Sequence, residues 1–346
     1  MRVAFVGSQP WMDCCTPPDG IAALELRSVV LTANDDAAED DLASAITALE
    51  GFDAHAMILL DAAHVPERLI EYAKQARATT LGVLVGGAPH EHAHSLSRLD
   101  RLVSFVPSLT GSRIGSQLLW RAIPPPISDV FYCGSDAVRP LHRAPRAMAV
   151  GRSTEHREVM LMPAKHHHDL LQVLHGVSGT WLAEIAREYD VGVFIARGPG
   201  GGFGWQVGMH LACGHLLLSD ELRPRHGLER NIDYLQVESA DELVSVLDRM
   251  GRFPEMHHRL RVRGRLKAEQ YRASRVFARI THDLLADVRA FGGASRGEAK
   301  ATGSLAAPSA ATLGDIGERV ANERGVDARR AKALGRAAPG VLDVDE

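Results

Sequence analysis

A cluster of glycines, Gly198–Gly204, is the stretch of this sequence best suited to bind a phosphate group. It follows an apolar run over 191–195 and precedes a helix-like run over 207–212. A glycine loop exposes backbone N–H groups and a helix start adds more, so this order favours anion binding. Next to the loop, Trp205 could stack on a base or sugar and Gln206 could donate a hydrogen bond. The order predicts a nucleotide-phosphate site, although a flexible loop has the same composition.

A second candidate anion site follows the apolar run over 147–150, where Gly151 and Arg152 come next. An arginine at a strand end can hold a diphosphate through charge-assisted, bidentate hydrogen bonds. An ordinary charged surface loop would contain the same residues. His175 and Gly176 end another apolar run at the same expected sheet edge, where a plain turn fits the sequence equally well.

Two histidine clusters have the residue types of a metal site without its spacing. His90, His92 and His94 would point one way on a strand, but the glycines and proline before them favour a loop. The consecutive residues His166–Asp169 would fan outward rather than converge. We therefore predict no metal site, and interpret His90, at the mouth of the first sheet, as a base or contact for an acceptor.

Composition indicates a globular protein with more than one domain. The chain has 346 residues, of which 45% are hydrophobic and 24% are charged, and this length predicts two domains. A net charge of -4 argues against nucleic-acid binding. The arginines between Arg249 and Arg279 favour a solvated helix face, with peripheral contact to anionic lipid as the alternative.

Cysteine spacing and hydropathy bear on the cellular compartment. The chain has 4 cysteines, whose spacing fits neither a zinc site nor a disulfide framework. No signal peptide is evident, and no apolar run reaches the roughly 18 to 20 residues that cross a bilayer. We predict a cytoplasmic protein without a transmembrane segment.

Strand and helix patterns alternate along both halves of the chain. In the first half we expect strands over 1–7, 28–32, 57–61, 81–85 and 102–106, a loop over 8–20, and helices over 21–26, 41–50, 65–77 and 112–122. In the second half we expect strands over 147–150, 171–174 and 191–195, and helices over 180–189, 207–212, 240–250 and 255–291. This alternation predicts an α/β protein with parallel sheets covered on both faces and ligands at the carboxyl ends of the strands.

Proline and small residues mark the expected boundaries. We predict an N-terminal domain over 1–123, a proline-rich linker over 124–145, a second domain over 146–291, and a flexible tail over 292–346 with a short helix near 316–334.

An ordered series in the second half resembles a known family. The series is Ala212–Ser219, His226–Glu229, Asp233–Leu235 and Ser239–Leu243. It is similar to the C-terminal donor-binding domain of GT-B glycosyltransferases, and within that fold to the bacterial CgeB-related, family 1-type group, over about residues 146–290. The resemblance implies two Rossmann-like domains facing each other across a cleft, with C-terminal helices crossing back onto the first domain.

The resemblance also implies a function and a set of donor-binding residues. It implies transfer of a sugar from a nucleotide-sugar donor to an acceptor, with a lipid-linked molecule or a glycan as candidate acceptor, and with no metal ion or other cofactor. The implied donor-binding residues are Gly151, Arg152, Ser153, His156, Arg157, His175, Gly176, Gly204, Trp205, Gln206, His210, Gly214 and Glu229. A half-buried structural role for His210 is an equal alternative.

The sequence departs from the family at the donor site. Many retaining GT-B enzymes have two glutamates with seven residues between them, and alignment on Ala212–Gly214 places Gly201 and Met209 there. An acidic residue and an arginine that are common near Gly204 and Gln206 in the closer group are also lost. A catalytically degenerate GT-B protein that binds nucleotide sugars or partners is therefore the alternative function. A nucleotide-sugar epimerase would need cleft-facing catalytic carboxylates and histidines that the sequence does not place.

Overall fold

The computed structural model describes residues 1–17, 24–31, 38–85, 93–114, 117–134, 138–174 and 177–293, which belong to one compact unit. The predicted tail after Gly293, including its expected helix, lies outside these residues. Among the helices that are described, none has the length and apolar character to cross a membrane.

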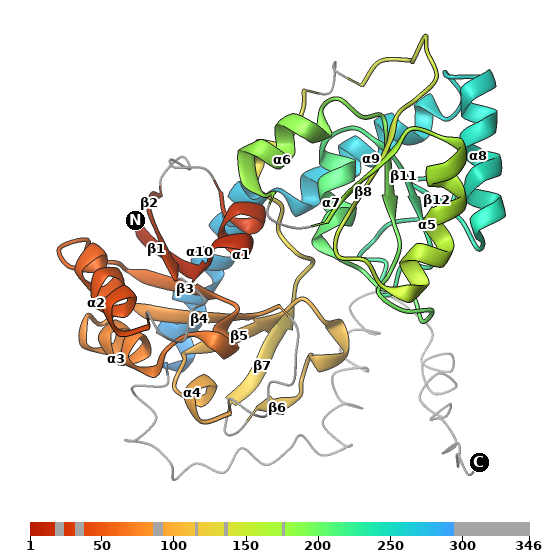
Figure 1. The fold of residues 1–346 in the computed structure, drawn as a ribbon. Coiled ribbons are helices and arrows are strands. Elements are labelled where there is room, and N and C mark those ends of the chain that lie inside the picture. Colours follow the sequence, from red (N-terminus) through yellow and green to blue (C-terminus); the bar gives the residue numbers. More distant parts are fainter. Residues whose placement is uncertain are drawn as a thin grey trace, which may run out of the picture. The chain divides into compact units, whose positions relative to one another are not determined.

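The described strands of the first half form a seven-stranded sheet in the order β2-β1-β3-β4-β5-β7-β6 (Figure 1). All neighbouring strands are parallel except β6 and β7. The strands are β1 (Arg2–Ser8), β2 (Glu25–Leu31), β3 (Ala56–Leu60), β4 (Thr79–Leu84), β5 (Arg101–Ser104), β6 (Arg113–Ile114) and β7 (Gln117–Ala122). The helices of this half are α1 (Gln9–Cys15), α2 (Ala38–Leu49), α3 (Glu67–Gln75) and α4 (Ala93–Ser97), with 3-10 turns η2 (Ala62–His64) and η4 (Pro107–Leu109).

Alternate residues of β1 face two separate apolar cores. Ala4 and Val6 pack with residues of α2 and α3, whereas Val3 and Phe5 pack with a helix from the end of the chain. Both faces of the strand are therefore covered, which explains why it is apolar at almost every position. The expected pattern for a buried parallel strand is confirmed.

The described strands of the second half form a five-stranded sheet in the order β12-β11-β10-β8-β9, with all neighbours parallel. The strands are β8 (Ala147–Val150), β9 (Leu170–Val173), β10 (Val191–Phe194), β11 (Leu216–Ser219) and β12 (Leu235–Gln236). A 3-10 turn, η5 (Asp129–Phe131), lies in the segment between the sheets. Helices α5 (Glu155–His167) and α8 (Ala240–Arg252) cover one face, and α6 (Gly179–Ala186) and α7 (Trp205–Ala212) cover the other.

The end of the described chain returns to the first sheet, as the resemblance implied. After α9 (His258–Lys267) and η7 (Ala268–Tyr271), helix α10 (Ala273–Phe291) packs in the same core as β1, β3 and β4 (Figure 1). The ring of Phe277 meets that of Phe5 edge to face, with centroids 4.9 Å apart. Ion pairs from Arg101 to Asp287 and from Arg121 to Asp283 fix the same helix.

The arginine-rich segment is only partly a solvated face. Arg261 and Arg265 are buried, and their guanidinium groups donate to the backbone carbonyls of Gly214 and Cys133 respectively. The expectation of a wholly solvated face is therefore wrong for these two residues, because their buried guanidinium groups are paired with backbone carbonyl groups.

Three expected elements of the first half are wrong, wholly or in part. The expected loop over 8–20 contains α1, because Pro10 stands in the first turn of a helix, where its missing N–H costs nothing. The expected helix over 112–122 is the pair β6 and β7, in which β7 hydrogen-bonds to β5. Of the expected helix over 21–26, Glu25 and Leu26 belong to β2 and 21–23 lie outside the described residues. The predicted domain boundaries stay predictions.

Candidate functional site

A cavity of about 800 Å³ lies between the carboxyl ends of the two sheets. Asp61 and Val85, which follow β3 and β4, line it from the first sheet, and Ala196, which follows β10, lines it from the second. Ligands of parallel α/β sheets bind at this edge. The cavity is therefore placed where the alternating pattern of the sequence predicted a ligand.

The cavity also lies at the point in each sheet where the strand order reverses. In the first sheet β2 and β3 lie on opposite sides of β1, and the cavity is lined by Trp11 after β1 and by His64 after β3. In the second sheet β9 and β10 lie on opposite sides of β8, and the cavity is lined by Arg157 after β8 and Arg197 after β10. Loops diverge at such a switch point and leave a crevice for a ligand.

The glycine loop after β10 is fixed by backbone hydrogen bonds rather than loose. The N–H of Gly202 donates to the carbonyl of Glu221 at 3.1 Å, and the N–H of Arg223 donates to the carbonyl of Gly202 at 3.1 Å. Gly201 has a φ of +75°, and a Cβ there would lie 2.4 Å from the Glu221 oxygen. The loop therefore requires glycine at 201 both for its backbone angle and for the approach of the neighbouring chain.

Two polar side chains beneath the loop hold its starting backbone. The buried guanidinium of Arg157 donates from Nε to the Ile195 carbonyl at 2.7 Å and from Nη1 to the Arg152 carbonyl at 2.8 Å. Burial lowers the pKa of Arg157, and the neighbouring Arg197 lowers it further. Asp220 accepts the Ala196 N–H at 2.9 Å, and burial raises the pKa of this carboxyl. Arg157 therefore ties the segments that follow β8 and β10 to each other.

Helix α7 begins directly at the cavity. Its N-cap is Gly204, which supplies no side-chain hydrogen bond, and its first turn contains no acidic residue. Trp205 and Gln206 line the cavity, and the indole of Trp205 lies against Phe131 with centroids 6.2 Å apart. An uncapped helix start carries partial positive charge and unpaired N–H groups, so it favours an anionic ligand.

Among the described residues, Asp61 and His64 are the titratable residues of the wall that belongs to the first sheet. The 3-10 turn η2 places His64 Nδ1 at 3.0 Å from Asp61 Oδ2. Trp11 and Phe105 line the same wall, with ring centroids 6.1 Å apart. Sequence reasoning gave Asp61 and His64 no role. The available signal for Asp61 was its place at the end of an expected strand.

Three predicted donor-site residues lie away from the cavity. His210 is fully buried within α7, where its ring packs against Gly192, and burial lowers its pKa well below the ordinary value. Gly214 lies beyond the far end of α7, and its carbonyl accepts from Arg261. Glu229 is exposed and its N–H donates to Asp233.

Of the predicted residues after β8, Arg157 lines the cavity, whereas Gly151, Arg152, Ser153 and His156 do not. Gly151 lies against the Arg157 guanidinium, Arg152 and Ser153 are exposed, and Ser153 donates to Glu158. His156 Nε2 lies 3.4 Å from Asp220 Oδ2. The other predicted site residues, His90, His175 and Gly176, lie outside the described residues.

The two positions that align with family glutamates have no ligand-facing side chain. Gly201 lines the cavity but has no room for a Cβ, as described above. Met209 is fully buried in the apolar core beneath the sheet. A carboxylate at either position would thus require a different local backbone or a buried charge.

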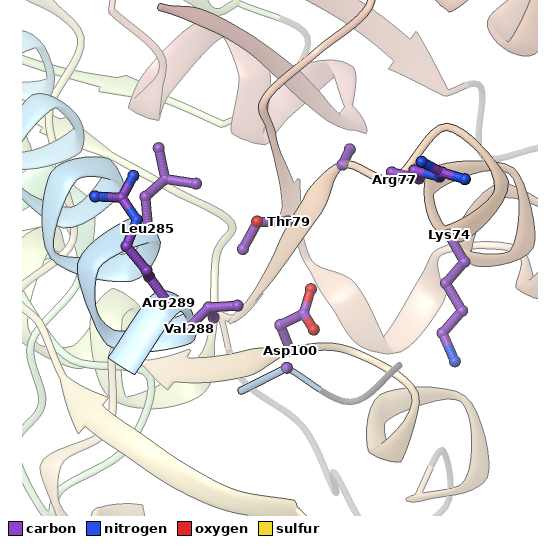
Figure 2. A pocket seen from close by; sticks show the side chains of 9 residues that line it. Lys74, Arg77, Thr79, Asp100, Leu285, Val288 and Arg289 are labelled. Carbon is purple, nitrogen blue, oxygen red and sulfur yellow. The ribbon is translucent and has the colours of Figure 1, made fainter. Parts of the chain in front are cut away.

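A second cavity, of about 580 Å³, lies at the amino ends of β4 and β5 (Figure 2). Figure 2 shows Arg289 on the opposite side of Asp100 from Lys74 and Arg77, so the cations do not converge on one point. Lys74 and Arg289 stand in the last turns of α3 and α10, where a cation offsets the partial negative charge of a helix end. Their charge is explained without a ligand.

Metal ligands do not gather within the described part of the chain. No group of three or more His, Cys, Asp or Glu side chains that could hold a metal ion occurs there. His94 lies on α4, with its Nε2 3.6 Å from Glu67 Oε1, and is strongly exposed. The expectation that the protein needs no metal ion stays a prediction.

No protein-family model matches the sequence, and no curated protein matches it. Solved structures do resemble the fold. The chain is similar to sucrose-phosphate synthase from Thermosynechococcus elongatus, with a TM-score of 0.54, 12% identity, and coverage of 83% of this chain and 99% of that one. It is also similar to Anabaena HepE in complex with UDP and glucose, with a TM-score of 0.51, 8% identity, and coverage of 83% of this chain and 100% of that one. The chain thus has the GT-B fold that its resemblance implied, while membership of the CgeB-related group stays a prediction.

Proposed function

We propose that this protein transfers a sugar from a nucleotide-sugar donor to an acceptor in the cavity between its two sheets. The observation that carries the proposal is the position of that cavity at the switch points of both sheets, with a fixed glycine loop and a helix start on one wall. The second sheet then binds the donor and the first sheet faces the acceptor. The fold alone would not establish this chemistry.

The donor diphosphate is assigned to Arg197, Arg157 and the start of α7. Arg197 is exposed at the cavity and forms no ion pair with the described residues. The Arg157 guanidinium uses Nε and Nη1 for backbone carbonyls, which leaves Nη2 for a phosphate oxygen. The N–H groups of Trp205 and Gln206 complete an arrangement of fixed positive charge.

This arrangement suits the chemical step as well as binding. When the bond between the sugar and the diphosphate breaks, negative charge grows on the leaving phosphate oxygen. Fixed donors that already point at this oxygen stabilise the transition state without reorganisation. Two arginines and a helix start would thereby take the place of a divalent metal ion, and we propose a metal-independent reaction.

The nucleoside is assigned to the cavity surface beside α7. The half-exposed Trp205 offers an aromatic face to a base or sugar ring, and Gln206 offers an amide for hydrogen bonding. Glycines over 200–202 leave space for the sugar, because no side chain projects from that part of the wall. Stacking and a few directed hydrogen bonds are the usual means by which a pocket orients such a ligand.

A binding protein without transferase activity is the second candidate. It is favoured by Gly201 and Met209, which bring no carboxylate to the donor sugar. Both candidates predict donor binding, but only the first predicts release of the nucleoside diphosphate from a bound nucleotide sugar.

A thermal-shift screen with UDP, GDP, dTDP, ADP and their sugars tests the donor site. Ligand at about 100 times its dissociation constant should stabilise the folded protein by about 2.7 kcal/mol. We expect one nucleotide family to raise the melting temperature, and Arg197→Ala to abolish the shift. Arg152→Ala is the matched control, since this exposed arginine at the same sheet edge does not line the cavity. No shift with any nucleotide, or equal loss in both variants, would contradict the proposal.

A further inference from the structure

We propose that a pocket beside the first turns of α10 binds a phosphate group, at a site separate from the donor cavity. The pocket has a volume of about 580 Å³, and its lining includes Arg275 and Arg279 of α10, Gln270 of η7 and His226. Among the described residues, the linings of this pocket and of the donor cavity have no member in common. The inference therefore does not depend on the proposed transferase function.

Two arginines of α10 face the pocket together. Arg275 and Arg279 are four residues apart, so they lie on successive turns of the same helix face, and both are exposed. Within the described part of the chain, Arg279 forms no ion pair or hydrogen bond. Guanidinium groups have a planar fork of donors that matches the oxygens of a phosphate group. The pair thus offers donors of the kind that a phosphate needs.

The carboxylates nearby do not neutralise this charge. Glu269, the acidic residue in the described lining, is shared by three arginines. Its Oε1 accepts from Arg265 at 2.7 Å and from Arg272 at 2.8 Å, and its Oε2 lies 3.1 Å from Arg275 Nη1. Arg272 also pairs with Asp129 at 3.3 Å. Two carboxylates thus serve three arginines, and the second arginine of the pocket adds a further positive charge.

Helix stability does not explain the two pocket arginines. The start of a helix carries partial positive charge, so cations in the first turns are unfavourable there, and the first turn of α10 has no acidic residue. Two like charges four residues apart on a helix also repel each other. Arg289 differs, because it stands in the last turn of α10, where a cation offsets the helix charge. A bound anion would offset the repulsion between Arg275 and Arg279.

The side chains, rather than the helix start, form the site. The N–H of Ala273 donates to the Ile127 carbonyl at 2.8 Å, and the N–H of Ser274 donates to Asp129 Oδ2 at 3.0 Å. These backbone groups are therefore already paired. A ligand in the pocket would be held by the guanidinium groups of Arg275 and Arg279.

The wall opposite the arginines is held in place by side-chain contacts. Gln270 Nε2 donates to the His226 carbonyl at 3.3 Å, and the hydroxyl of Tyr271 donates to the same carbonyl at 2.9 Å. The His226 ring meets that of Phe203 edge to face, with centroids 4.5 Å apart. The pocket is thus formed before any ligand binds, as is usual for small-molecule sites.

The pocket adjoins the donor cavity. Pro124 and His226 line the pocket, while Pro125 and Pro224, one and two residues away, line the donor cavity. A phosphate group at this place belongs either to a small soluble compound or to a lipid headgroup, because both present the same oxygens to the arginines. The experiment has one arm for each source.

The test uses Arg197→Ala as the parent protein, because the donor cavity is itself a candidate anion site and this change weakens it. Inorganic phosphate is titrated into the parent in calorimetry. Separately, the parent is sedimented with phosphatidylglycerol vesicles, with zwitterionic phosphatidylcholine vesicles as the reference. Adding Arg275→Gln and Arg279→Gln together should weaken binding of the phosphate probe about tenfold or more, the loss expected when charged hydrogen bonds are removed.

A matched pair of substitutions controls for net charge. Arg249→Gln with Arg252→Gln removes the same charge from two exposed arginines in the last turn of α8, which do not line the pocket. This pair should bind like the parent. Urea unfolding separates binding from structure, because removal of the two pocket arginines should not lower the free energy of unfolding.

The outcomes separate the two sources and can overturn the site. Phosphate binding that requires the pocket arginines would identify a soluble phosphate compound as the ligand, and binding of anionic vesicles alone would identify a lipid headgroup. Three results would overturn the proposal and leave the donor assignment unaffected. They are no binding of either probe by the parent, equal losses in the pocket and control pairs, and a loss of stability in the pocket pair.

Discussion

The buried histidine pair of the second sheet should make the protein less stable in mild acid. His210 and His215 are 0% and 1% exposed, and their Nδ1 atoms lie 3.0 Å apart. His215 Nε2 lies 2.9 Å from the carbonyl of Ala186, which can only accept, so this nitrogen carries a hydrogen. His215 Nδ1 then accepts from His210 Nδ1–H. Both rings are neutral in this arrangement, and His210 Nε2 has no hydrogen-bond partner among the described residues.

The direction and size of the effect follow from the pKa values. Burial lowers the pKa of His215 to about 4 and that of His210 well below its ordinary value. The unfolded chain binds these protons near pH 6.5, so between that pH and the native pKa the unfolded state holds more protons and the free energy of unfolding falls as pH falls. For His215 alone the loss is about 1.4 kcal/mol per pH unit, and about 3 kcal/mol in total. His210 adds a loss of the same sign.

Urea unfolding at several values between pH 7.5 and 5 measures this dependence. His215→Gln keeps a hydrogen-bond donor for the Ala186 carbonyl but does not titrate. Its free energy of unfolding should therefore fall less steeply with decreasing pH than that of the wild type, by about 1.4 kcal/mol per pH unit. His166→Asn is the control, because His166 is exposed and should leave the slope unchanged. Asp220 has a raised pKa, so its contribution to the pH dependence of stability has the opposite sign. Because Asp220 is present in every variant, comparison between variants removes this contribution. A wild-type slope in His215→Gln would refute the reasoning.

Two further substitutions test the packing of the last helix and the shape of the glycine loop. Phe277→Ala should lower the free energy of unfolding by about 3 to 5 kcal/mol in chemical denaturation, because the Phe277 ring is fully buried against Phe5. Phe291→Ala should lower it little, because Phe291 is 81% exposed. Equal losses would contradict the packing. Gly201→Ala should weaken nucleotide binding about tenfold or more in calorimetry, since a left-handed backbone costs a residue with a Cβ about 1 to 2 kcal/mol and the Glu221 carbonyl must also move. Gly200→Ala, with open space around its Cβ, should bind like the wild type, and unchanged affinity in Gly201→Ala would count against the loop assignment.

Much of the fold could be predicted because buried parallel strands leave a clear mark on the sequence. All residues of β3 and β10 are buried, and both are short apolar runs ended by loop residues. The segment that forms β7 could not be assigned in this way. Its apolar residues suit a helix as well as a strand, and the pairing of β7 with β5 decides between them. Such pairing is a tertiary contact, which a local pattern does not contain.

The site was predictable only in part, for the same reason. The glycine loop and Arg157 could be proposed because each follows an expected strand of one sheet. His210 was included because α7 begins at the loop, yet its burial depends on Gly192, where a Cβ would lie 2.2 Å from the His210 ring. Asp61 and His64 were given no role because they come from the first sheet. The sequence does not show that the glycine loop of the second sheet lines the same cavity.

Hydrogen exchange of the backbone with and without UDP-glucose tests the central assignment most directly. If the donor binds between the sheets, the ligand should slow exchange in peptides that cover 196–207, where the glycine loop and the start of α7 line the cavity. Peptides that cover 74–80 and 286–293, around the cavity of Figure 2, should be unaffected. Protection confined to those peptides, or no protection at 196–207 under conditions where the ligand binds, would contradict the account.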